Sequence, residues 1–184
     1  KANEFVGYLP NAETVEPDTK LGLDDMFELV RKADEDYRTL QEKKEKLKQK
    51  IEEYRAKQQI VAPFRPLECD LHRVLHYRYI TYRFGRIAVE FYHKMQKYLM
   101  DDLKAIFVEG ERDESYVYGV YFVSQAETQK VDAVFRSLHF ERIELKDEFE
   151  GTPDTAYRVL ENEIARVNLE IEDLDKQAGE MLAD

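Results

Sequence analysis

Residues 24–61 read DDMFELVRKADEDYRTLQEKKEKLKQKIEEYRAKQQIV, and apolar residues recur along them at alternating steps of four and three. Such steps place the apolar side chains on one narrow stripe of an α-helix, which is typical of a coiled-coil seam. Lys44 is the one charged residue at a seam position. The seam consists of Met26, Val30, Ala33, Tyr37, Leu40, Lys44, Leu47, Ile51 and Tyr54.

Ordinary boundary residues mark the ends of this helix. Asp24 and Asp25 place negative charge in its first turn, and the Ala62-Pro63 step disfavours further helix. We therefore predict a coiled-coil helix over residues 23–62. Residues 1–22, which contain prolines, are predicted to form an extended lead-in.

A second seam occupies residues 151–184, again with alternating steps of three and four. Thr152 is suited to cap a helix, and Pro153 is suited to its first position. The pattern is still strong near Asp184, so we expect a truncated helix that continues in a longer parent protein. The seam consists of Tyr157, Leu160, Ile164, Val167, Ile171, Leu174, Ala178 and Met181.

Each predicted helix has an apolar stripe too narrow to be stable alone, so each requires a partner. The nearest partner is the other helix in antiparallel orientation, because a compact lobe between them brings their ends together. The basic stretch 43–57 then faces the acidic beginning of the second helix, which favours this pairing modestly. An intermolecular coiled coil is the alternative.

Between the helices, residues 63–150 hold most of the aromatic residues and alternate between strand-like and helix-like hydrophobic periods. The resulting order, β-α-β-β-α-β, is typical of a ferredoxin-like lobe with both helices on one face of an antiparallel sheet. The predicted fold class is therefore α+β: a long antiparallel coiled-coil hairpin bearing a ferredoxin-like (βαββαβ) lobe at its tip. Strands are expected at residues 77–84, 104–109, 115–123 and 140–145, and helices at residues 87–100 and 126–138.

The face of the sheet away from the helices raises a separate question. The strand predicted at 115–123 is apolar on both faces, although helices on one side require only one apolar face. We expect the segment 64–76, or the root of the coiled coil, to cover the second face, and a protein partner is the alternative. The residues predicted to contact such a partner are Tyr77, Tyr79, Arg83, Tyr116 and Tyr118.

Composition excludes several classes of protein. The 184 residues include 39 acidic and 28 basic side chains, which gives a net charge of −11. This excess disfavours a general nucleic-acid binder, and a single cysteine excludes a disulfide scaffold. The longest uncharged run, residues 115–126, is too short to cross a membrane, so we expect no direct membrane insertion.

Residues that often carry chemistry do not form a recognisable site. No glycine-rich phosphate-binding loop is present. Cys69, His72 and His76 have the spacing of metal ligands on one helix face, but no fourth ligand is evident, and a linker with surface histidines is expected instead. We therefore predict no catalytic residue, no metal and no cofactor. Solvated or turn-forming roles are expected for His93, Asp101, Asp102 and His139.

Two other classes of function are alternatives. The aromatic strand 116–122 is similar to those of RNA-binding modules, which share the β-α-β-β-α-β order and stack bases on the open face of the sheet. The acidic balance of the lobe argues against this alternative, and we expect no nucleic-acid partner. A self-associating coiled-coil hinge or adaptor is the second alternative.

Three short motifs resemble one protein family. Phe84-Gly85-Arg86, the string Ser137-Leu138-His139-Phe140-Glu141-Arg142, and Gly151-Thr152-Pro153 are similar to the cytosolic N-terminal half of the large membrane subunit of rotary V-type ATPases. This protein is subunit I in bacteria and archaea and subunit a in eukaryotes. The resemblance covers residues 24–184. It departs from the family at Ile87-Ala88, where Leu-Pro is common, and the family's N-terminal lobe and membrane half are absent.

The resemblance implies a non-catalytic stator arm. In the family, the distal lobe holds the peripheral stalks and the arm resists the torque of the rotor. The implied partners are peripheral-stalk subunits of the E and G type, and the rest of the membrane sector through the missing C-terminal half. The implied location is the cytoplasmic face of a membrane, while proton passage belongs to the missing half.

Overall fold

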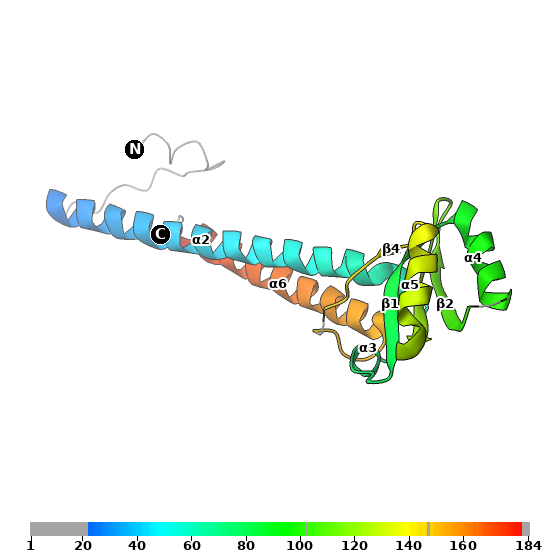
Figure 1. The fold of residues 1–184 in the computed structure, drawn as a ribbon. Coiled ribbons are helices and arrows are strands. Elements are labelled where there is room, and N and C mark those ends of the chain that lie inside the picture. The colour runs from blue at the N-terminus through cyan, green and yellow to red at the C-terminus, as the bar shows by residue number, and fades with distance from the viewer. Residues whose placement is uncertain (1–21, 102, 147, 182–184) are drawn as a thin grey trace.

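The structure, a computed structural model, describes residues 22–101, 103–146 and 148–181. It consists of a long helical hairpin with a lobe of strands and short helices at one end (Figure 1). All but the last residue of the predicted lead-in, and the last three residues of the second predicted helix, lie outside the described residues.

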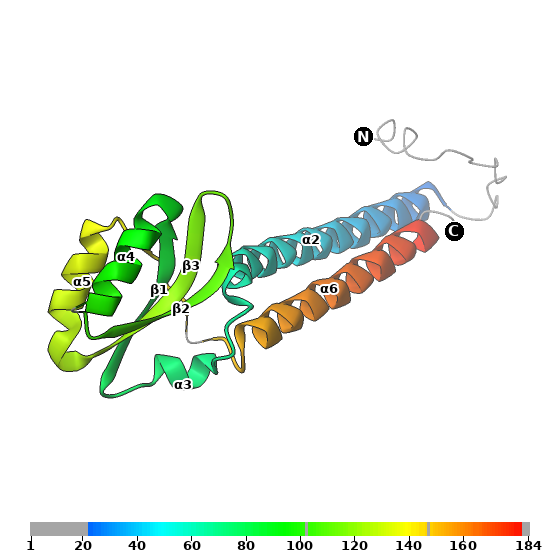
Figure 2. The ribbon, with the colours of Figure 1, turned by 90° about the vertical axis from the view of Figure 1, so that its right-hand side faces the viewer.

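The hairpin is formed by α2 (Leu23–Val61) and α6 (Pro153–Met181), which run antiparallel and lie side by side (Figure 2). The predicted pairing within one chain is therefore confirmed over the intermolecular alternative. The residues that face the partner helix from Tyr37 to Tyr54 are all buried or half-buried, as the four-three spacing predicts. Lys44, the charged seam residue, pairs with Asp175 of the other helix at 2.5 Å between Nζ and Oδ1.

The first turns of α2 lie beyond the described end of α6. Since Lys44 lies against Asp175 and the described part of α6 ends at Met181, no described residue of α6 lies opposite the start of α2. Met26 and Val30 were predicted at the seam, but they are 47% and 63% exposed for this reason. The described seam is therefore filled only from about Tyr37 onward.

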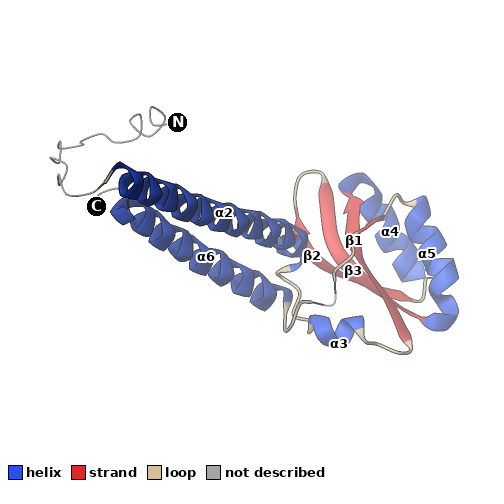
Figure 3. Cartoon of the chain, turned by 90° about the vertical axis from the view of Figure 1, so that its left-hand side faces the viewer, coloured by secondary structure: helices blue, strands red, loops and turns tan. Residues whose placement is uncertain are grey.

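The lobe contains a four-stranded sheet of β1 (Ile80–Ala88), β2 (Ala105–Arg112), β3 (Tyr116–Ser124) and β4 (Glu141–Arg142). The spatial order is β2-β3-β1-β4, and every neighbouring pair is antiparallel. The helices α4 (Val89–Asp101) and α5 (Thr128–Ser137) lie on the same face of the sheet (Figure 3). The predicted ferredoxin-like topology is confirmed.

The predicted strand boundaries require three corrections, one of which is that β2 continues to Arg112 and does not end at residue 109. The first strand was predicted at 77–84, but it begins at Ile80 and continues to Ala88, because its pairing with β3 extends as far as Tyr116. The last strand was predicted at 140–145, but only Glu141 and Arg142 pair with β1. The chain then leaves the sheet, and Leu145 and Phe149 are buried on the coiled-coil side instead.

Two apolar clusters lie on opposite faces of the sheet. The helix-side core packs α4 and α5 against Ile87, Val117, Tyr121 and Val123. The coil-side core packs Phe84 and Val120 of the sheet against the root of the hairpin. Its buried members are Val61, Phe64, Leu67, Leu71, Val74, Phe84, Val120, Leu145, Phe149, Ala156 and Leu160.

The coil-side core covers the second face of the sheet. The 3₁₀ turn η2 (Ala62–Phe64) and the short helix α3 (Leu71–Leu75) lie against this face, with Phe64 and Leu71 completely buried. The expectation that the segment 64–76 or the coiled-coil root covers this face is confirmed, and both contribute buried residues to it. No separate partner is needed to bury Phe84 and Val120.

Replacing Lys44 by Leu should raise the melting temperature of the hairpin. The Lys44 side chain is 22% exposed, so a Leu there gains apolar burial, while the lost ion pair involves Asp175, which is half exposed and contributes little. We expect a net gain of about 1 kcal/mol, or roughly 2–5 °C, by circular dichroism. Lys48→Leu, on an exposed position of the same helix, serves as the control, and an unchanged melting temperature for Lys44→Leu would contradict the seam assignment.

Candidate functional site

Strands β1 and β4 bring two of the sequence motifs side by side. Gly85 pairs with Arg142, and Arg86 pairs with Glu141. A Cβ atom at Gly85 would lie 2.2 Å from the carbonyl oxygen of Glu141 and 2.5 Å from Cζ of Phe140. The glycine is therefore required by the close approach of β4 and by the Phe140 ring that packs over it.

The string 137–142 begins with a helix C-cap. His139 has φ of 58°, and its backbone N–H donates to the carbonyl of Arg136, while the N–H of Phe140 donates to the carbonyl of Phe135. This pair of bonds is the Schellman arrangement, with His139 in the left-handed position. The rings of Phe135 and Phe140 meet edge to face at 5.3 Å, which supplies the apolar contact that accompanies the motif. The turn-forming role expected of His139 is confirmed.

Arg86 joins the same edge on the coil-side face. Its guanidinium bonds to the Glu141 carboxylate, with Nε 2.7 Å from Oε2, and lies 4.1 Å from the centre of the Tyr116 ring. Two hydrogen bonds raise the pKa of Arg86: the larger effect comes from the bond with Tyr118, and the next from the bond with Glu141. Two of the predicted partner-binding tyrosines are therefore engaged by an arginine of their own sheet.

The third motif begins α6. Gly151 has φ of 72°, and its carbonyl accepts a bond from the N–H of Leu71 at 2.8 Å. Thr152 Oγ1 accepts a bond from the N–H of Thr155 at 3.2 Å, and Pro153 is the first helical residue. The predicted cap is confirmed. All three motifs thus have structural roles, since they anchor β4, end α5 and begin α6.

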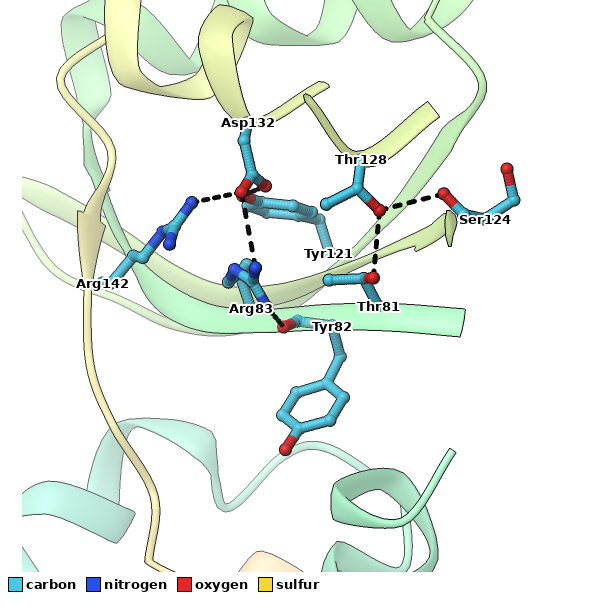
Figure 4. Close-up of polar contacts among 8 residues, drawn as sticks. All are labelled: Thr81, Tyr82, Arg83, Tyr121, Ser124, Thr128, Asp132 and Arg142. Carbon is cyan, nitrogen blue, oxygen red and sulfur yellow. Dashed lines mark hydrogen bonds and ion pairs between the residues drawn. The ribbon is translucent and has the colours of Figure 1, made fainter. Parts of the chain in front are cut away.

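A polar cluster on the helix side of the sheet centres on Asp132 of α5 (Figure 4). Its carboxylate accepts hydrogen bonds from Arg142 at 2.5 Å, from the Tyr121 hydroxyl at 2.7 Å and from Arg83 at 3.4 Å. The Asp132 side chain is 14% exposed, whereas those of Arg83 and Arg142 are 31% and 43% exposed. The cluster therefore ties α5, β1, β3 and β4 together where the last strand leaves the sheet.

Burial alone would raise the pKa of Asp132, but the hydrogen bond from Tyr121 and the charges of Arg83 and Arg142 outweigh it and hold the pKa below its usual value. Burial, together with the hydrogen bond to Asp132, raises the pKa of Tyr121. The cluster is thus built around an ionised carboxylate and a neutral tyrosine at neutral pH.

A groove lies beside this cluster, between β1 and the segment that follows β4. Its lining includes apolar and aromatic side chains from the start of β1 and basic side chains from both walls. The members that matter for its chemistry are Tyr77, Ile80, Tyr82, Arg83, Arg142, Glu144 and Lys146.

The five residues predicted to contact a partner do not form one patch. Tyr77 and Tyr79 precede β1 and are 47% and 80% exposed. Arg83 points to the helix side with Asp132, whereas Tyr116 and Tyr118 lie with Arg86 on the other face. The structure brings Tyr77 and Arg83 to the groove.

Sequence reasoning missed Asp132 and the partner role of Arg142. Asp132 follows Val131, a buried residue of α5, and an acidic residue at that place in an amphipathic helix was the available signal. Its partners come from three different strands, at sequence separations of 10, 11 and 49 residues, so helical or strand spacing alone did not reveal them.

The weak metal hypothesis gains no support from geometry. Across the described parts of the chain, no group of three or more His, Cys, Asp or Glu side chains is arranged to hold a metal ion. His72 and His76 lie ring to ring at 4.3 Å, and the Nδ1 of His76 is 2.8 Å from the carbonyl of His72. Burial raises the pKa of the Cys69 thiol.

Within the same described residues, no helix is both long and apolar enough for a bilayer crossing.

No family model matches the sequence, and no curated protein matches it. Among solved structures, the chain is similar to the crystal structure of the cytoplasmic N-terminal domain of subunit I, homolog of subunit a, of V-ATPase. The TM-score is 0.50 and the sequence identity is 15%, and the match covers 98% of this chain and 62% of that one. The chain thus has the fold of the domain that its motifs resemble, and it spans less than two thirds of that domain's length.

Replacing His139 by Val should destabilise the lobe. A β-branched residue is strained at φ of 58°, at a cost of about 1–2 kcal/mol, whereas Asn tolerates this conformation. We therefore expect a lower free energy of unfolding for His139→Val than for His139→Asn in urea denaturation. Both variants lose the contact of the His139 ring with Phe91, so their difference isolates the backbone strain. Equal stability of the two variants would contradict the left-handed cap.

Replacing Asp132 by Asn should lower stability at neutral pH and should matter less in acid. Because the folded pKa of Asp132 is depressed, its contribution is complete above its unfolded pKa of about 4 and is lost as the pH falls through the lower folded value. We expect a loss of about 1–3 kcal/mol at pH 7, since two arginines lose their carboxylate partner. Urea denaturation from pH 7 down to about pH 3 measures this. A difference between the two proteins that does not narrow toward pH 3 would contradict the assignment.

Proposed function

We propose that the chain is the distal part of a stator arm in the large membrane subunit of a proton-translocating rotary V-type ATPase. In this role it catalyses nothing. Its lobe docks peripheral-stalk subunits of the E and G type, and its hairpin leads to the membrane sector on the cytoplasmic face of a membrane. The fold similarity and the three sequence motifs support the proposal together.

The observation that carries the proposal is the shared core between hairpin and lobe. Val61 of α2 and Leu160 of α6 are buried in the same cluster as Phe84 of β1 and Val120 of β3. A lobe joined by a flexible linker would pivot on the hairpin, whereas a lobe that shares a core with it moves with it. A load applied to the sheet is therefore passed to both helices.

Polar contacts reinforce the same junction. Arg65 pairs with Asp154 at the first turn of α6, at 2.7 Å, and its guanidinium lies 4.2 Å from the centre of the Tyr157 ring. The N–H of Leu71 bonds to the carbonyl of Gly151 immediately before that helix. These contacts connect the exit of α2 to the entry of α6, as the root of a strut requires.

The RNA-binding alternative loses the feature that suggested it. It depended on an exposed aromatic sheet face, but the coil-side core covers that face. Tyr116 and Tyr118 are only partly exposed there, and both interact with Arg86. A base-stacking platform of the usual kind is therefore not available on this face.

Titration calorimetry of the chain against the E- and G-type stalk heterodimer of the same organism tests the proposal. Single-stranded RNA at physiological salt is the parallel titrant. We expect saturable binding of the heterodimer and no heat from RNA. RNA binding without stalk binding would overturn the proposal, and silence in both titrations would contradict docking by this lobe on its own.

A further inference from the structure

In the described structure, the first residues of β1, Ile80 to Arg83, have a strand on one side only, so they form an open edge of the sheet. β4 pairs with β1 only at Gly85 and Arg86, and the last bond runs from the N–H of Ile143 to the carbonyl of Phe84 at 2.9 Å. The chain then turns away because Leu145 and Phe149 are buried in the coil-side core. The stretch from Ile80 to Arg83 is therefore paired with β3 alone.

The groove beside this edge is basic on an acidic protein. Arg83 and Arg142 share the single carboxylate of Asp132, so one positive charge is left over in the cluster. The buried Nε of Arg83 has no hydrogen-bond partner in the described structure. Lys146 adds a further positive charge to the lining, against one acidic residue, Glu144. The chain as a whole carries a net charge of −11, so this groove is a local exception.

Arg83 also protects the edge. Its Nη1 donates to the carbonyl of Tyr82 at 2.9 Å, so a side chain of β1 itself satisfies a backbone acceptor near the open edge. Charged side chains at a sheet edge commonly prevent indiscriminate pairing. A partner strand that brings its own N–H group to Tyr82 releases the guanidinium of Arg83, which then needs an anionic partner. An acidic side chain on the incoming strand meets that requirement.

The apolar part of the groove fits an extended strand rather than a single ion. Ile80 is 43% exposed and Tyr77 is 47% exposed, and both line the groove. Side chains alternate between the two faces of a strand, so one face of a partner can contact these apolar groups while the other meets the arginines. The opposite sheet edge, β2, carries Glu109 and Glu111 against one basic residue, Arg112, so it is a less favourable edge for an acidic strand.

We propose that the groove accepts an extended, acidic segment of a protein partner as an added β-strand on β1 between Ile80 and Arg83. Backbone hydrogen bonds to the edge give affinity, and Arg83, Arg142 and Lys146 select acidic side chains. The inference rests on the proposed function only for the identity of the protein that supplies the strand. It concerns where a partner binds, rather than which complex the chain belongs to.

A defined probe tests the site. The probe is a ten-residue peptide, blocked at both ends, in which Glu alternates with Val and Thr, and the control peptide has Lys in place of Glu. Titration into ¹⁵N-labelled protein should shift the amide signals of residues 79–83 and 143–146 in a saturable way. Hydrogen exchange at the edge of β1 should slow in the complex. The Lys peptide should bind at least about tenfold more weakly, and salt should weaken the binding of the Glu peptide.

Two variants test whether the basic side chains of the groove bind the Glu peptide. Lys146→Glu reverses an exposed groove charge without touching either core, and we expect about a fivefold or greater loss of affinity for the Glu peptide. Its matched control is Lys48→Glu on α2, which should bind as the unmodified protein does. Arg142→Gln should also weaken binding by at least about threefold, with Arg158→Gln on α6 as its control. Arg142→Gln removes an ion pair with Asp132 and could unfold the protein for that reason. In that case the Lys146→Glu variant still tests the proposal.

Four results would overturn the inference: no saturable shifts at millimolar peptide, equal binding of the two peptides, shifts centred on β2, or a bound peptide with helical signals. The outcome is separable from that of the proposed function. If the unmodified protein binds the stalk heterodimer but shows no saturable binding of the Glu peptide, the strand site alone is rejected. Peptide binding without stalk binding would reject the stator assignment and leave the site in place.

Discussion

The burial of Phe64 between the hairpin and the sheet is the constraint on which the rest of the structure depends. Its ring is completely buried and meets the Phe84 ring edge to face at 5.2 Å. Because Phe64 follows α2 by only three residues, the sheet is placed directly at the end of the helix. The return of the chain through Gly151 and the cap at Thr152 then sets α6 beside α2. The hairpin and the lobe therefore form one folded unit with a shared core.

Much of this architecture was predictable because it follows from the spacing of apolar residues along the helices and strands. The four-three spacing from Tyr37 to Tyr54 identified residues that are buried or half-buried in the hairpin, and a strand apolar on both faces correctly indicated a covered sheet. The length of the last strand was not predictable in this way. Leu145 and Phe149 had two apolar faces available to them, and only the packed structure shows that they fill the coil-side core.

The candidate site was less accessible from sequence for a related reason. Arg83 was predicted to share a partner surface with four tyrosines, but it lies with Asp132 on the helix side, whereas Tyr116 and Tyr118 lie on the other face of the sheet. Asp132 contacts residues from β1, β3 and β4, and no local spacing connects them. The three family-like motifs were recognisable as strings, yet their roles as cap, close approach and helix start became apparent only from backbone geometry.

The two helices of the hairpin have a mechanical consequence that neither would have alone. When the lobe is pushed sideways in the plane of the hairpin, one helix is stretched and the other is compressed, as in the two flanges of a beam. The bending stiffness of such a beam depends on how well its flanges resist sliding past each other. The buried or half-buried side chains of the seam, which include Leu47, Ile51 and Val167, supply that resistance, and the pair of Lys44 and Asp175 marks the register of the two helices.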